Sequence, residues 1–128
     1  MSGAGICSLP KAIRTGTRFD SGGWILNSAV KKVFEITEKF GTRDAFEIAR
    51  RANVSVIYES WYPATFGEFE RKTQVIRVNL RASECGISFE KIVAHELGHF
   101  FALNLKLNKN EEEIFARAFA ENLTGNDK

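Results

Sequence analysis

The two histidines of this 128-residue chain, His95 and His99, lie four residues apart in a stretch with helical periodicity. Apolar residues around them recur at three- and four-residue steps, as on the buried face of a helix. These residues are Ile92, Val93, Leu97, Phe100 and Phe101. Because residues i and i+4 lie one turn apart on the same face of a helix, both imidazoles can reach one point. The chain is therefore expected to fold around a buried helix that presents two imidazoles together.

The segment His95-Glu96-Leu97-Gly98-His99 has the H-E-x-x-H pattern, in which the two histidines bind zinc and the glutamate acts as a general base. A pair of neutral histidines packed in the core is the alternative interpretation. Gly98 favours the first one, because a glycine inside a helix costs about 1 kcal/mol relative to alanine. Close approach of another backbone or of a ligand is the usual reason for such a glycine.

A catalytic zinc ion needs a third protein ligand and an open position for water. The sequence has no third histidine, so the candidates are one cysteine and four carboxylates: Cys85, Glu111, Glu112, Glu113 and Glu121. Glu113 shares its helix face with Ala116 and Ala120, small residues that would let its helix come close. Glu112 stays open as an alternative, and the first-turn glutamates can equally be solvated residues that interact favourably with the helix dipole.

The other patterns predict a single α+β domain over residues 24–128, preceded by a flexible arm over residues 1–23. The predicted helices cover 24–40, a segment from the cap Thr42 to 52, a segment from the cap Ser88 to 105, and 111–123. The predicted strands cover 54–60, 65–70 and 74–80, and the last two form a hairpin. We expect the last helix to fold back and bring its carboxylates to the histidines.

The composition excludes several classes of function. Eighteen Lys and Arg against sixteen Asp and Glu leave a net charge of +2, too little for nucleic-acid binding by bulk electrostatics. No segment approaches the roughly 20 apolar residues that span a bilayer, and the first residues lack the pattern of a signal peptide. Cys7 and Cys85 can form at most one bridge, so we expect reduced thiols in a cytoplasmic and monomeric protein.

Several segments together resemble the ImmA/IrrE metallopeptidases of bacteria, phages and integrating mobile elements, over roughly residues 28 to 123. The segments are Gly41–Ala49, Val56–Tyr58, Gly67–Phe69, Val75–Asn79 and Phe89–His99. The family follows its zinc motif with E-x-x-A-N-x-F-A, and Glu113–Ala120 matches this pattern except at Arg117. Arg117 stands where the family has Asn or Asp, a residue that can orient a ligand histidine. We expect Arg117 to form a surface ion pair with Glu113 or Glu121.

This resemblance implies a minimal zincin-like core, a three-stranded sheet packed against the H-E-x-x-H helix. It implies a zinc ion held by His95, His99 and Glu113, with Glu96 as the general base. It also implies an edge strand at residues 75–79 that holds a peptide substrate by strand addition, with Ile76 and Val78 in contact with the substrate. A strand that belongs only to the sheet core is the alternative, which the sequence favours equally.

The resemblance further implies a metalloendopeptidase that cleaves a partner transcriptional repressor of the helix-turn-helix type. Two alternatives remain at this point. One is a non-catalytic module that holds zinc and sequesters the repressor without cutting it, and the other is a small peptidase of broader specificity.

Overall fold

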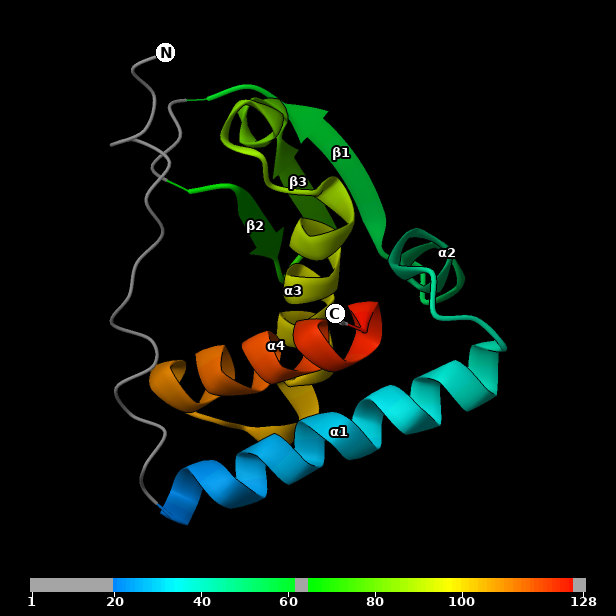
Figure 1. Ribbon diagram of the computed structural model, residues 1–128, viewed down its shortest axis with the longest axis vertical. Helices are drawn as coiled ribbons and strands as arrows, with labels where there is room; N and C mark the ends of the chain where they lie inside the picture. Colours follow the sequence, from blue (N-terminus) through cyan, green and yellow to red (C-terminus); the bar gives the residue numbers. More distant parts are fainter. Residues whose placement is uncertain (1–19, 62–64, 126–128) are drawn as a thin grey trace.

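The structure is a computed structural model that describes residues 20–61 and 65–125. In chain order its elements are α1 (Asp20–Phe40), α2 (Ala45–Arg51), β1 (Ser55–Glu59), β2 (Gly67–Glu70), β3 (Val75–Asn79), the 3-10 helix η3 (Leu80–Cys85), α3 (Phe89–Phe101), the 3-10 helix η4 (Leu103–Leu105) and α4 (Lys109–Thr124) (Figure 1). The predicted α+β class, with one small three-stranded sheet against the histidine-bearing helix, is confirmed.

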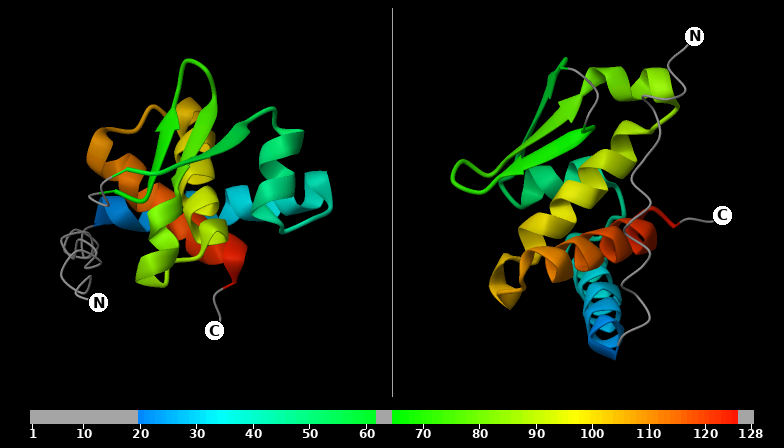
Figure 2. Two further views of the ribbon diagram at one scale, coloured as in Figure 1. Left: turned by 90° about the horizontal axis from the view of Figure 1, so that it is seen from above. Right: turned by 90° about the vertical axis from the view of Figure 1, so that its left-hand side faces the viewer.

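The elements form successive layers, with α3 at the centre. The sheet lies on one side of α3, α4 packs against the other side, and α1 packs on α4 (Figures 1 and 2). Helix α2 lies beside β1 and α3. Within the described residues, no helix is both long enough and apolar enough to cross a lipid bilayer. The histidine-bearing helix is thus covered by protein on two sides, and α4 is the element that can supply further ligands.

The strand order β1-β3-β2 corrects the expected substrate edge. Strand β3 lies in the middle, parallel to β1 and antiparallel to β2, so its backbone is paired on both sides. The side chains of Ile76 and Val78 are fully buried in the core. Strand β3 has the most buried side chains of the three strands, as expected for a strand covered on both sides. These two residues therefore cannot line an open edge, and β2 is the edge strand next to α3.

Helix α1 begins at Asp20, before the predicted start at Trp24, so the last residues of the expected flexible arm are helical. The rest of that arm, residues 1–19, lies outside the described residues. The apolar residues of α1 divide between two faces. Ile25, Ala29, Val33 and Ile36 are buried, whereas Trp24, Val30 and Phe34 are exposed. Only the first group contributes to the core with α4.

Two helix boundaries differ from the prediction. Helix α2 is capped by Asp44, whose Oδ1 accepts hydrogen bonds from the backbone N–H groups of Phe46 and Glu47, and not by Thr42. Thr42 instead accepts a hydrogen bond from the backbone N–H of Asp44. Helix α3 starts after the predicted cap Ser88 but ends at Phe101, because the chain turns through η4. A capping box of Asn108 and Glu111 then starts α4. This tight connection returns α4 directly to α3.

Gly98 sets the separation of α3 and α4. A Cβ atom at this position would lie 2.6 Å from the Cα atom of Ala116 and 3.0 Å from its carbonyl oxygen. Real Cβ atoms do not approach backbone this closely, so any larger residue would push the helices apart. The expectation that Gly98 marks a close backbone approach is confirmed.

We predict that Gly98→Ala destabilises the protein by about 1–3 kcal/mol, the usual cost of overpacking a core, although alanine is the better helix former. The measurement is chemical denaturation followed by circular dichroism. Gly23→Ala is the matched control, because Gly23 also lies in a helix but has nothing within 4 Å of its added Cβ. The control should be neutral or slightly stabilising. An equally stable Gly98→Ala variant would contradict the packing argument.

Candidate metal centre

Helix α3 presents the two imidazoles together, as the spacing predicts. The ring centroids of His95 and His99 lie 5.2 Å apart, with their planes at 33°. Both side chains are partly buried, with 28% and 21% of their surface exposed. The alternative interpretation of a closed pair of core histidines does not fit this partial exposure. Both imidazoles therefore keep part of their surface exposed to solvent.

Helix α4 places Glu113 between the two rings. Its Oε2 lies 3.1 Å from His95 Nε2, and its Oε1 lies 3.2 Å from His99 Nε2. One ligand atom from each of the three residues falls within 4.8 Å of the others, so the group can hold a metal ion. The three predicted ligands are thus brought together. Among the described residues no other such group of His, Cys, Asp and Glu is found.

The other ligand candidates have different positions. Glu111 closes the capping box of α4, and Glu121 lies exposed nearly three turns further along the helix. Cys85, at the end of η3, is disulfide-bonded, which corrects the expectation of a reduced thiol. None of the three belongs to the group of His95, His99 and Glu113.

Glu112 has a role that the sequence did not predict. Its Oε2 accepts a hydrogen bond from Nδ1 of His99 at 2.8 Å, on the opposite side of the ring from Glu113. Arg71, in the turn between β2 and β3, donates from Nη2 to both oxygens of Glu112 at 2.8 and 3.1 Å. Glu112 is therefore a partner of a metal-ligand candidate, not a ligand. The available signal was its position on the apolar face of α4, where a carboxylate needs partners.

Opposite charges hold the cluster together. The hydrogen bonds and charges of His95 and His99 outweigh the effect of burial and keep the pKa of the Glu113 carboxyl well below its ordinary value. Burial by itself would lower the pKa of His99, but Glu113, Glu96 and Glu112 outweigh it and raise this pKa to about 9. The carboxylates thus favour positive charge at the His99 imidazole. A divalent cation can supply that charge in place of protons.

Glu96 lies buried under the first residue of β2. A Cβ atom on Gly67 would lie 3.0 Å from Glu96 Oε2 and 2.5 Å from Ile92 Cγ2, so only glycine lets the strand pass so close. Burial raises the pKa of Glu96; the charges of His95 and His99 oppose this shift, and those of Glu113 and Glu68 add to it. The glutamate of the motif is therefore held beside the ligand group, at the start of the edge strand.

The expected surface ion pair of Arg117 is not formed. No salt bridge joins Arg117 to Glu113 or Glu121 within residues 20–61 and 65–125. Glu113 is engaged by the histidines, and the Nε atom of Arg117 is buried without a hydrogen-bond partner. The physical reason is position, because Arg117 lies between the buried residues Ala116 and Ala118 on α4. Arg117 therefore does not replace the orienting Asn or Asp.

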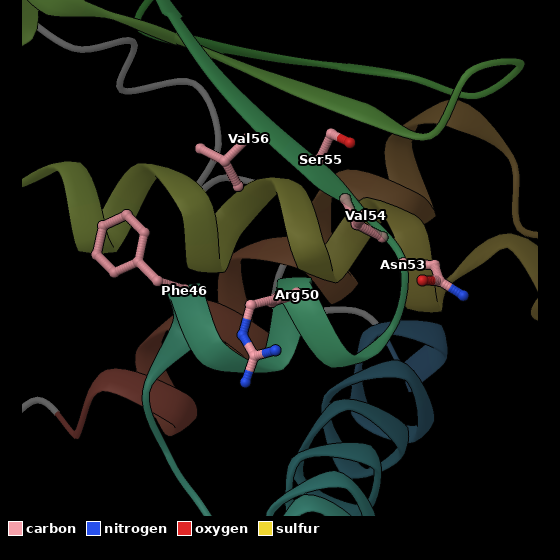
Figure 3. A pocket seen from close by; sticks show the side chains of 6 residues that line it. All are labelled: Phe46, Arg50, Asn53, Val54, Ser55 and Val56. Carbon is pink, nitrogen blue, oxygen red and sulfur yellow. The ribbon is translucent and has the colours of Figure 1, made fainter.

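A separate pocket of about 420 Å³ lies between α2 and β1 (Figure 3). Phe46 and Arg50 line it from α2, and Val54, Ser55 and Val56 line it from the strand side. Arg50 is an exposed side chain paired with Glu47. The pocket includes no residue of the histidine group, so it is distinct from the candidate metal centre.

Searches against family models, curated proteins and solved structures find no match to this chain. The geometry of the cluster is therefore the basis for the functional argument.

We predict that Glu113→Gln weakens the binding of a divalent metal ion by more than about 100-fold, since loss of a direct ligand should exceed the 10–100-fold loss typical of outer partners. Competition with a chromogenic chelator measures the affinity. Glu121→Gln, which removes a carboxylate from the exposed part of the same helix, should bind like the wild type. Equal affinities of the wild type and Glu113→Gln would exclude Glu113 as a ligand.

Proposed function

We propose that this protein is a zinc-dependent endopeptidase. The observation that carries the proposal is the convergence of His95 Nε2, His99 Nε2 and the Glu113 carboxylate, with Glu96 of the same H-E-x-x-H segment beside them. No match among known proteins assigns this chain to a family. The resemblance of its motif segments to ImmA/IrrE metallopeptidases supports the proposed peptidase activity.

The donor set fits zinc. Two imidazole nitrogens and one carboxylate are a common set of protein ligands for catalytic zinc, which keeps a fourth position for water. The partial exposure of His95 and Glu113 allows a water molecule to reach that position. A structural zinc site would instead close its shell with a fourth protein ligand, and the described residues offer only these three.

When bound, zinc supplies a water of lowered pKa and polarises the scissile carbonyl group. Glu96 accepts the proton of the attacking water, and its carboxyl group then donates this proton to the leaving amine. Glu96 directly follows the ligand candidate His95 in the H-E-x-x-H segment, so its carboxyl group is placed to hold the proton between these two steps. Glu112 keeps the Nε2 atom of His99 directed to the metal side.

The open edge of β2 (Gly67–Glu70) is the proposed binding place for the substrate backbone, in place of β3. One side of β2 pairs with β3, and no other strand of residues 20–61 and 65–125 pairs with its second side, where an extended peptide could add. Gly67 brings this strand against Glu96, so a peptide added to the edge would lie near the proton acceptor.

We propose a helix-turn-helix transcriptional repressor as the substrate, cleaved in the cytoplasm as a regulatory step in a phage, mobile element or stress response. This part of the proposal rests on the resemblance of the motif segments. The alternatives, sequestration of the repressor without cleavage and a peptidase of broader specificity, are outcomes of the following test.

We predict that zinc-loaded protein cleaves internally quenched peptides, or a helix-turn-helix repressor encoded beside its gene, and that Glu96→Gln lowers the cleavage rate by at least about 100-fold. General base catalysis typically contributes 10²–10⁴-fold. Fluorescence and mass spectrometry of the products measure the rate. Glu121→Gln is the control, because Glu121 is an exposed carboxylate outside the group of His95, His99 and Glu113.

Glu96→Gln should keep the zinc affinity of the wild type, because Glu96 is not a ligand. Inactivation of the repressor by Glu96→Gln would favour the sequestering module. Cleavage of general peptides with the repressor left intact would favour the broader peptidase. A zinc-loaded wild type that cleaves neither substrate would contradict the proposed activity.

A further inference from the structure

We propose that Arg71 and Glu112 form a tether that positions the His99 imidazole for metal binding. Both are positioning residues, since each acts on the metal through His99. The inference rests on the proposed metal site but not on peptide hydrolysis.

Glu112 is a buried carboxylate, and each of its two oxygens accepts at least one hydrogen bond. It is only 8% exposed, and both its oxygens are used. Oε2 accepts from His99 and Arg71, and Oε1 accepts from Arg71. A buried carboxylate without partners would be costly. These contacts therefore fix the position of Glu112 on α4 and with it the position of its partner ring.

The hydrogen bond at Nδ1 decides how His99 presents its other nitrogen. When Nδ1–H donates to Glu112, the neutral ring carries its lone pair on Nε2, the atom that faces Glu113. Metal-ligating histidines are commonly held in this way by a carboxylate on the second ring nitrogen. The contact thus selects both the tautomer and the orientation that a metal ion at the group of His95, His99 and Glu113 requires.

Arg71 connects this device to another part of the fold. It follows directly after β2 and lies 41 residues before Glu112 in the chain. Its side chain is 60% exposed, so its attraction to Glu112 is screened by solvent and salt. The tether therefore joins the end of the edge strand to a ligand histidine. Its inner contact, Glu112 with His99, is buried, and its outer contact, Arg71 with Glu112, is weakened by solvent.

The tether also accounts for Arg117. Arg117, one turn after Glu113 on α4, makes no hydrogen bond through its buried Nε and forms no salt bridge with Glu113. Glu112, immediately before the ligand candidate Glu113, contacts the ring in its place.

The test measures the zinc affinity of the full chain by chelator competition. We expect Glu112→Ala to bind zinc 10–100-fold more weakly, the usual range for such partners. Glu112→Gln should recover part of the loss, because its amide oxygen still accepts from Nδ1–H. Arg71→Ala should weaken binding by about threefold at low salt, as expected for an exposed ion pair, and by less at high salt.

Two controls separate positioning from charge and from general stability. Glu111→Gln removes one negative charge from the neighbouring residue and keeps the capping box, since Gln also serves there. Arg81→Ala breaks the Arg81–Glu84 surface ion pair. Both should bind zinc like the wild type. In the zinc-loaded protein, proton NMR should show a slowly exchanging His99 ring N–H that exchanges faster in Glu112→Ala.

Zinc affinities of Glu112→Ala and Glu112→Gln within twofold of the wild type would overturn the tether alone, as would an equal loss in Glu111→Gln and Glu112→Gln. If Glu112→Ala does not fold, Glu112→Gln and Arg71→Ala decide by the same criterion. A wild type that binds no zinc would overturn the proposed function together with the tether. A wild type that binds zinc tightly without cleaving peptides would overturn only the activity.

Discussion

The contact of α3 with α4 at Gly98 is the constraint on which the candidate site depends. Because Gly98 has no side chain, the backbone of Ala116 can approach α3 closely. The turn of α4 before Ala116, which carries Glu113, then lies within reach of the histidines. Glu113 lies three residues before Ala116, one helical turn away, and therefore projects toward the same face of α3. A wider helix pair would leave two imidazoles and a carboxylate too far apart to share one ion. The helix cost of a glycine is thus offset by the geometry that it permits.

Opposite charges make it possible to bury several ionisable side chains between α3 and α4. Carboxylates at Glu96, Glu112 and Glu113 gather around two imidazoles, and each carboxylate would be unfavourable there alone. Two of them have specific partners, since Glu113 contacts both rings and Glu112 contacts one ring and Arg71. Glu96 has no such pair, and burial raises its pKa. The site therefore holds two carboxylates that contact the imidazoles beside a third, buried one that does not.

The sequence predicted the parts that depend on local spacing. Positions i and i+4 on one helix, the cap at Ser88 and the small residues beside Glu113 are all local features, and the structure has each of them. It did not predict the strand order, because parallel pairing of β1 with β3 joins two strands that are separated in the chain by β2. The partner of Glu112 was missed for the same reason, since Arg71 lies 41 residues away. Helical periodicity places Glu112 on a buried face but cannot say which residue meets it there.

The central position of β3 changes how the sheet can contribute to recognition. If β3 were the edge, its buried residues Ile76 and Val78 would have to serve both the core and a bound peptide. With β2 at the edge, each strand has one role. Strand β3 packs into the core, and the second backbone side of the strand Gly67–Glu70 pairs with no other described strand. The same short strand contacts Glu96 at its first residue and leads into Arg71 after its last one. A peptide that pairs with this strand would therefore lie beside the proton acceptor Glu96 at one end of β2. At the other end it would lie near Arg71, which contacts the partner of a ligand histidine.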